Sequence, residues 1–236
     1  MHCRACASSF RAATPWTRAR GVAWFRCPRC GQVRVEPSAV PGPEAAAARY
    51  RLHRNDPAEP GYRAFLETFV DRALAPFAAP PARVLDFGSG PAPALALLLR
   101  ERGYDAEAWD PLFAPDRRAL TGPFVLVAVH EVLEHVPYPY RLLSTLARKL
   151  APGGSIAVRT RFPPERPEDF ARWWYKEDPT HIGFFGPLAF EALSRRLGAD
   201  LALLEAPDLA VLRFSAEAGQ AGRCRAGSDD PLRDCP

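Results

Sequence analysis

An apolar segment that runs into a glycine turn is the part of this 236-residue chain best suited to hold a ligand. The residues of the turn are Asp86, Phe87, Gly88, Ser89 and Gly90. Glycines let a backbone turn sharply and approach a ligand more closely than a side chain would allow. The next apolar segment ends at a lone acid, Asp110, followed by Pro111, and an acid at this separation suits the two hydroxyls of a ribose. The pattern predicts a nucleotide-type ligand above a parallel sheet.

Four cysteines near the N-terminus have the spacing of a metal site. They form two Cys-x-x-Cys pairs, Cys3 with Cys6 and Cys27 with Cys30. Four thiolates can complete a tetrahedron around Zn²⁺, and an ion with all four positions filled is structural. Gly31 allows a tight turn after the second pair, and the apolar residues before that pair predict a strand. Disulfides are the alternative, and the lack of an apolar leader makes zinc the favoured interpretation.

Histidines and a glutamate are the candidates for acid–base chemistry. His130 and Glu131 follow a predicted strand, at the end of the sheet where ligands bind in open α/β folds. His181 lies in a segment rich in aromatic residues, where substrate contact or simple packing would both suit it. A histidine with an ordinary pKa near 6.5 is a natural general base. His135 is interpreted as a capping or packing residue.

The apolar patterns that must position these residues alternate between strand and helix, which predicts a doubly wound, mostly parallel α/β sheet. Strands are expected at 83–87, 106–109, 124–129, 155–159, 200–205 and 209–214, and helices at 44–54, 62–77, 92–102, 138–150 and 187–197. The last two strands should form an antiparallel hairpin. Residues 111–123 are too few for a further helix and strand, so a third strand is degenerate or absent, and Asp116 is the candidate acid of that region.

Length and composition indicate one α/β domain with a small accessory module. We expect a zinc-ribbon-like module at 1–36, a proline-rich linker at 37–43, the main domain at 44–214 and a disordered tail at 215–236. Cys224 and Cys235 lie in this tail, outside the zinc site.

The net charge of +4 does not by itself indicate nucleic acid, because lysine occurs only at Lys149 and Lys176 and the arginines accompany a general bias toward arginine, alanine and proline. No apolar run reaches the roughly 18 to 20 residues that a membrane helix needs. We therefore expect a cytoplasmic protein with no membrane partner. The oligomeric state stays open.

Three motifs in chain order carry a resemblance to a known family. Asp-x-Gly-x-Gly at 86–90 resembles motif I of class I S-adenosylmethionine-dependent methyltransferases, although Ala92 stands where a third glycine is common. Residues 130–136 resemble the Glu-x-x-Glu-His segment of the small-molecule methyltransferases grouped with quinone-biosynthesis O-methyltransferases and zinc-ribbon-bearing sugar C-methyltransferases. Pro152-Gly153-Gly154 is similar to the turn before their fifth strand.

The resemblance implies S-adenosylmethionine as cofactor and structural zinc in the ribbon. The implied cofactor-binding residues are Asp86, Phe87, Gly88, Ser89, Gly90, Asp110, Pro111, His130 and Glu131. The catalytic candidates are His181, His130 and Glu131. Residues 173–185 resemble a loop on the substrate side, whereas Arg159 and Arg161 are interpreted as solvent-facing.

The implied function is transfer of a methyl group to oxygen or carbon of a small molecule. One alternative is an RNA or protein methyltransferase that uses the ribbon for recognition, which the arginines of the ribbon keep open. Another is a non-catalytic binding protein that has kept the fold.

Overall fold

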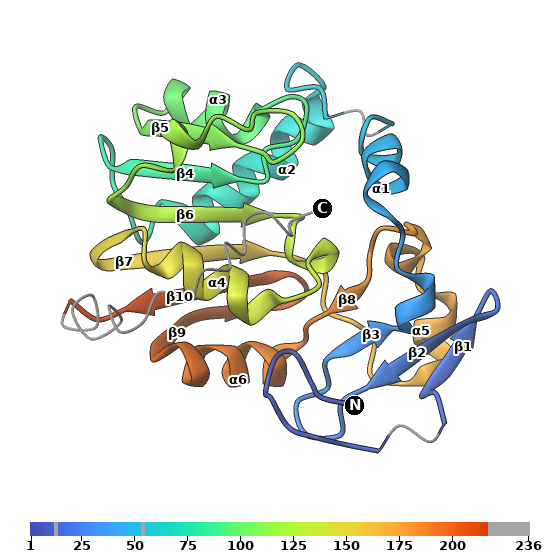
Figure 1. The fold of residues 1–236 in the computed structure, drawn as a ribbon. Coiled ribbons are helices and arrows are strands. Elements are labelled where there is room, and N and C mark those ends of the chain that lie inside the picture. The colour runs from blue at the N-terminus through green and yellow to red at the C-terminus, as the bar shows by residue number, and fades with distance from the viewer. Residues whose placement is uncertain (12–13, 53–54, 217–236) are drawn as a thin grey trace.

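A six-stranded sheet forms the centre of the computed structural model, which describes residues 1–11, 14–52 and 55–216 (Figure 1). Its strand order is β5-β4-β6-β7-β10-β9. The strands are β4 (Arg83–Phe87), β5 (Asp105–Trp109), β6 (Phe124–His130), β7 (Leu150–Arg159), β9 (Ala199–Glu205) and β10 (Leu209–Phe214). Strands β5, β4, β6 and β7 are parallel, and β10 is antiparallel to both of its neighbours. The predicted fold class, including the closing antiparallel hairpin, is confirmed.

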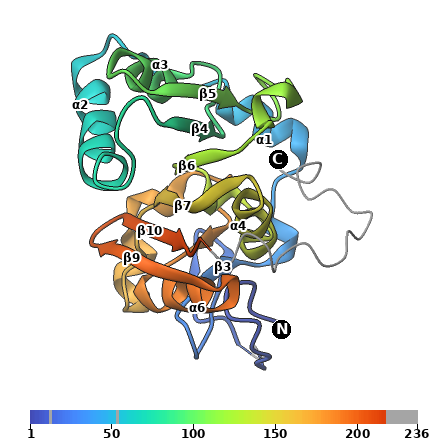
Figure 2. The same cartoon turned by 90° about the vertical axis from the view of Figure 1, so that its left-hand side faces the viewer.

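Helices cover both faces of this sheet, as Figure 2 shows for α2 and α4 on opposite sides. The α-helices are α1 (Pro43–Tyr50), α2 (Pro60–Phe69), α3 (Ala94–Glu101), α4 (Pro139–Ala147), α5 (Pro167–Arg172) and α6 (Pro187–Leu197). Shorter helical segments are η1 (Pro37–Ala39), η2 (Val70–Leu74), η3 (Arg117–Leu120), η4 (Leu133–His135) and η5 (Trp174–Glu177). Proline occupies the first turn of each α-helix except α3, where its fixed φ suits the helix start and its missing N–H costs nothing.

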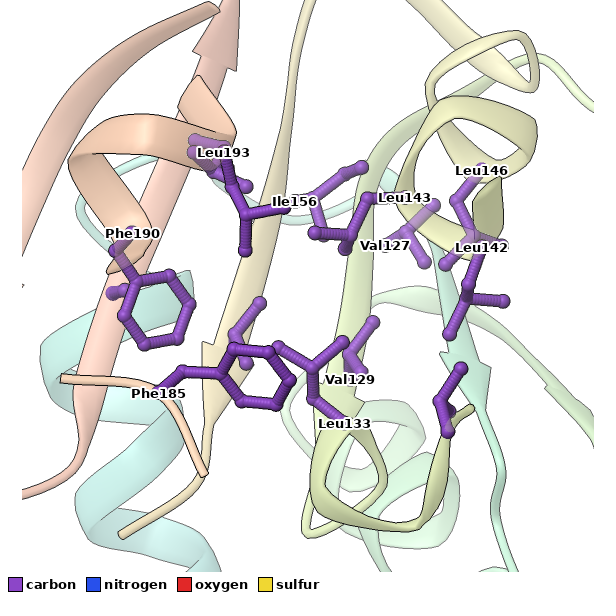
Figure 3. Packing of buried hydrophobic residues seen from close by; sticks show 14 of the residues in the cluster. Val127, Val129, Leu133, Leu142, Leu143, Leu146, Ile156, Phe185, Phe190 and Leu193 are labelled. Atoms are coloured by element: carbon purple, nitrogen blue, oxygen red, sulfur yellow. The ribbon is translucent and has the colours of Figure 1, made fainter. Parts of the chain in front are cut away.

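The core divides between the two faces because side chains alternate along each buried strand. On β6, Val127 and Val129 join the cluster under α4 and α6, whereas Leu126 and Ala128 join the cluster under α2 and α3. Figure 3 shows the first cluster, in which Ile156 of β7 lies among side chains from α4, α6 and Phe185.

A second sheet joins the N-terminal segment to the rest of the chain. Its order is β1-β2-β3-β8, built from β1 (Thr17–Ala19), β2 (Val22–Arg26), β3 (Val33–Val35) and β8 (Gly183–Phe184). Strand β2 was expected. The pairing of β3 with β8 was not, because a strand of two residues has no sequence pattern. The N-terminal segment therefore shares a sheet with the segment that carries His181.

Several element boundaries differ from expectation for local reasons. The helix expected at 92–102 begins at Ala94, because Pro91 and Pro93 precede it and have no backbone N–H. Strand β7 begins at Leu150, five residues earlier than expected, and so takes up the predicted glycine turn. Between β5 and β6 the described chain forms η3, turns and one isolated bridge, so β5 is the edge of the sheet, and the expectation that a third strand is degenerate or absent is confirmed.

Some expectations fall outside the described residues. They are the disorder of residues 217–236, the position of Cys224 and Cys235, and the end of the first helix at residues 53–54. Among the helices of the described chain, none has the length and apolar character needed to cross a membrane.

Candidate functional site

A cavity of about 460 Å³ lies beyond the carboxyl ends of β4, β5 and β6. This is the end of an open α/β sheet at which ligands bind. Its floor is the glycine turn with Asp110, and its walls come from α1, α2 and the segment 174–181. All nine residues predicted to bind a cofactor line this cavity, as does His181.

The glycine turn requires glycine for two different reasons. Gly88 and Gly90 have φ angles of 77° and 67°, in the left-handed region that side chains disfavour. A Cβ atom on Gly88 would also lie 2.5 Å from the Cγ2 atom of Val132, so any larger residue would displace the segment after β6. The position of Gly90 is open toward the cavity, where the nearest atom to such a Cβ belongs to Asn55, 3.9 Å away.

Backbone donors hold the carboxylate of Asp110 in place beside this turn. The amide of Gly90 donates to Oδ2 at 2.9 Å, and the amides of Leu112 and Phe113 donate to Oδ1 at 2.8 and 3.0 Å. Asp110 is 7 % exposed. Oδ1 thus accepts two hydrogen bonds and Oδ2 only one, so Oδ2 keeps a second lone pair with which it can accept a hydrogen bond from a ligand in the cavity.

Asp86, near the end of β4, lies at the other side of the turn, and its carboxylate contacts the first turn of α3. It is 3 % exposed and accepts a hydrogen bond from the amide of Ala96 at 3.2 Å. Burial raises the pKa of Asp86 to about 7, because little water remains to stabilise the charged form. A cationic ligand group beside it would favour the ionised carboxylate.

The two predicted groups at the end of β6 have different environments. His130 packs against the rings of Phe65 and Phe69, and this burial lowers its pKa to about 3. A histidine with so low a pKa is neutral at pH 7 and a weak base. Glu131 has a φ of 55°, unusual for a residue with a side chain, and it also lines the cavity.

Tyr175 links two carboxylates in the wall of the cavity. Its hydroxyl lies 2.9 Å from Oε2 of Glu131 and also hydrogen-bonds Oε1 of Glu134. Burial, together with the Glu134 carboxylate, raises the pKa of Glu131 to about 8. Tyr175 and Glu134 were not among the predicted site residues. The aromatic composition of 173–185 was a signal for Tyr175, but its contact with Glu134, 41 positions earlier, was not visible in the sequence.

The two remaining histidines of the cavity face each other, with ring centroids 4.7 Å apart. Nδ1 of His181 donates to the carbonyl of Tyr175 at 2.6 Å, and Nδ1 of His135 donates to the carbonyl of Thr180 at 3.0 Å. His135 was interpreted as a packing residue, and it is indeed buried. It also lines the cavity, which that interpretation did not include.

The interpretation of Arg159 as solvent-facing was wrong. It is 6 % exposed, and it donates to Oδ2 of Asp208 at 3.1 Å and to the carbonyl of Phe65 at 2.8 Å. Its guanidinium lies 3.7 Å from the centroid of the Phe65 ring, which it holds against the cavity. Asp116 is not at the cavity either: it caps η3 through the amide of Arg118.

The four N-terminal cysteines come together as predicted from their spacing. Their sulfur atoms lie within 4.8 Å of one another, with 3.5 Å between Cys3 and Cys30 and 3.7 Å between Cys6 and Cys27. Zinc–sulfur bonds of about 2.3 Å in a tetrahedron place sulfur atoms about 3.8 Å apart, so the group has the dimensions of a Zn²⁺ site. A disulfide would need about 2.05 Å.

Both cysteine pairs lie on similar turns. The residue after each pair has a left-handed backbone, with φ of 61° at Ala7 and 70° at Gly31. The amide of each of these residues donates to the carbonyl of the first cysteine of its pair, at 3.1 and 2.9 Å. Glycine was expected in this role, and Ala7 shows that the first turn accepts the strain of a side chain.

The arrangement described above is a Rossmann-like α/β fold with a ligand-sized cavity at the carboxyl end of its sheet. The family profile described as "Methyltransferase domain" matches residues 60–204, and the chain belongs to this family. A search of curated proteins gives no match.

Solved structures share the fold at low sequence identity. A chain of the complex between the Haloferax volcanii Trm112 methyltransferase activator and the putative methyltransferase is 15 % identical, with a TM-score of 0.54, over 72 % of this chain and 97 % of that one. Magnesium protoporphyrin IX methyltransferase from Synechocystis PCC 6803, with bound S-adenosylhomocysteine, is 14 % identical, with a TM-score of 0.51, over 72 % and 93 %. At these identities the likeness concerns the fold alone.

Proposed function

We propose that this chain is an S-adenosylmethionine-dependent methyltransferase that acts on an oxygen or carbon atom of a small molecule. The observation that carries the proposal is the hydrogen bond from the Gly90 amide to the Asp110 carboxylate, which joins the glycine turn and the acid at the floor of the cavity. Membership of the methyltransferase family supports it. The cavity volume also falls within the range of about 300–1,000 Å³ that is usual for small-molecule sites.

The cofactor would lie along the floor of the cavity. Asp110 would accept from the ribose hydroxyls, and the open backbone at Gly90 would allow the close approach of the nucleoside. Asp86 would favour the ammonium group of the amino acid part, because its buried carboxyl is most stable when a cation is near. The other proposed contacts are Phe87, Gly88, Ser89, Pro111, His130 and Glu131, all at the cavity surface.

The sulfonium of S-adenosylmethionine already activates the methyl group, so the protein must mainly align the acceptor and exclude water. His181 and Glu131 are the stronger catalytic candidates, since both line the cavity and both hydrogen-bond Tyr175. His130 is the weaker one, because its pKa near 3 makes it a poor proton acceptor.

We also propose that the four cysteines hold one structural Zn²⁺ and that residues 1–36 form a zinc ribbon followed by a linker at 37–43 and the methyltransferase domain at 44–214. The sulfur–sulfur distances support this. The carbonyl oxygen of the Gln32 side chain accepts from the Ala5 amide and lies 3.1 Å from the sulfur of Cys3, which helps to fix the first cysteine pair.

The contacts of the ribbon arginines favour a small molecule over an RNA acceptor. Arg26 donates to the carbonyl of Glu165 and lies over the ring of Trp16, and Arg20 pairs with Glu177 at 2.7 Å. These side chains bind other parts of the same chain rather than form a free basic stripe. A nucleic-acid or protein acceptor therefore remains the second candidate.

The first test is calorimetric titration of the protein with S-adenosylmethionine and S-adenosylhomocysteine. We expect micromolar dissociation constants. Asp110→Ala should weaken binding at least tenfold, because hydrogen bonds to a charged group contribute about 1.5–3 kcal/mol. Asp116→Ala is the matched control, since it removes an exposed acid outside the cavity, and it should change the affinity less than twofold. Lack of binding by the folded wild-type protein would favour the non-catalytic alternative.

A further inference from the structure

Three metal-ligating side chains converge beside the cavity, apart from the cysteine site, and two of them, His135 and His181, line it. One carboxylate oxygen of Glu134 and one ring nitrogen each of His135 and His181 lie within 4.8 Å of one another. The three residues are 0 %, 9 % and 8 % exposed. Two imidazoles and a carboxylate in one place are a donor set that suits a divalent transition-metal ion.

The hydrogen bonds of the two histidines prepare them for such an ion. Each Nδ1 faces a backbone carbonyl, that of Thr180 for His135 and that of Tyr175 for His181. A carbonyl can only accept, so Nδ1 carries the proton in both rings and Nε2 keeps its lone pair. Metal-ligating histidines are oriented in this way by a hydrogen bond from the second nitrogen.

The environment of Glu134 is an independent indication that a ligand binds here. Its Oε1 accepts from Tyr175, but its Oε2 is buried and has no hydrogen-bond partner among the described residues. A buried carboxylate oxygen without a partner costs about 1–3 kcal/mol or more. Glu131 contacts the same phenolic hydroxyl, so one hydroxyl serves two carboxyl groups and leaves Oε2 of Glu134 without a donor. Within the described chain, no arginine or lysine forms an ion pair with either glutamate.

We propose that Glu134, His135 and His181 bind a divalent cation at the edge of the cofactor cavity. The ligand atoms around an ion with bonds of about 2.1 Å are about 3 Å or slightly more apart, so the three side chains would need only to move somewhat closer. Three protein ligands leave coordination positions open toward the cavity. The site is separate from the cysteine cluster, whose thiolates select zinc.

This inference rests on the proposed methyl transfer and narrows its acceptor. A cation at this site indicates a hydroxyl group, preferably beside a second oxygen, rather than a carbon atom. A divalent ion lowers the pKa of an oxygen that it binds and orients it. The acceptor O–H bond would release its proton to water, the oxygen would form the new bond to the methyl carbon, and the electrons of the broken carbon–sulfur bond would remain on sulfur as the neutral thioether.

The test is a titration of the zinc-loaded protein with Mn²⁺, in which free Mn²⁺ is counted by electron paramagnetic resonance. Mn²⁺ is the probe because it is paramagnetic and, as a weak competitor for thiolates, would leave zinc in the cysteine site. We expect one bound Mn²⁺ per chain, and at least tenfold weaker binding in Glu134→Gln and in His181→Asn. His2→Asn changes an exposed histidine outside the cavity and should bind like the wild type.

Two further measurements distinguish loss of the cation site from misfolding and from failure of the cofactor proposal. Thermal unfolding and zinc content should match the wild type in Glu134→Gln, which keeps the shape of the side chain, so loss of Mn²⁺ there reports the site and not the fold. Asp110→Ala should lose S-adenosylhomocysteine affinity and keep Mn²⁺ affinity. Absence of saturable Mn²⁺ binding by the wild type, or equal binding by Glu134→Gln and His181→Asn, would overturn the cation site while leaving the cofactor proposal to its own titration.

Discussion

Asp86 illustrates how a single residue of the candidate site opposes stability. Its carboxyl is buried at the start of α3, and burial raises its pKa from 3.8 to about 7. In the folded protein it therefore keeps a proton that the unfolded chain releases near pH 4. Stability falls as the pH rises from about 4 to about 7, and no further change comes from this group above pH 7, where both states are ionised.

Asp86→Asn should remove this dependence, because an amide does not titrate. Over about 3 pH units at 1.36 kcal/mol each, the free energy of unfolding of the wild type should fall relative to the variant by roughly 4 kcal/mol at most. Urea unfolding of the cofactor-free proteins at pH 4.5, 6 and 8 measures it. Asp116→Asn, which removes an exposed acid, is the control. Parallel profiles for the wild type and Asp86→Asn would show that the buried carboxyl does not titrate in this range.

At the scale of elements, the pairing of β3 with β8 connects the ribbon to the wall of the cavity. The amide of Val35 donates to the carbonyl of Ile182, and the amide of Ile182 donates to the carbonyl of Glu134. One residue thus joins the ribbon to the segment after β6, directly beside His181.

Cys27→Ser should release the proposed zinc and loosen this connection. We expect faster hydrogen–deuterium exchange in peptides that contain Ile182 and Gly183, and a smaller increase in peptides from β4, which lies on the far side of β6. Arg29→Ser is the control, because it changes an exposed side chain between Cys27 and Cys30. It should keep the zinc and the slow exchange of Ile182 and Gly183. Zinc loss without faster exchange at 182–183 would mean that the strand pairing holds without the metal.

Contacts between regular strands could be predicted from the sequence, whereas contacts made by irregular segments could not. The carboxyl ends of parallel strands meet at one edge, so the contact between the glycine turn and Asp110 could be expected from two strand patterns and a spacing. The bond between Tyr175 and Glu134 depends on how an irregular segment folds back across the sheet, and no periodicity records that. Arg159 was misassigned because its partner Asp208 lies 49 positions away, and charge alone suggested solvent.

At the scale of the whole molecule, the ribbon and the methyltransferase sheet share their apolar cores. Trp24 and Val33 of the ribbon pack with Phe170 and Phe184, and Cys27 and Cys30 belong to the same cluster as β6 and α6. A segment of about 36 residues is too small to be stable without a metal or a partner. The two predicted modules should therefore unfold together.

Calorimetric unfolding of the full chain should show one transition. S-adenosylhomocysteine at 100 times its dissociation constant should raise the stability of the whole molecule by about 2.7 kcal/mol and move the entire transition to higher temperature. Arg49 of α1 joins this unit through its ion pair with Asp178, 2.9 Å away, so α1 and the segment 174–181 close the same cavity as the glycine turn. Two separate transitions, with only the larger one moved by the ligand, would instead show that the ribbon is an independent module resting on the domain.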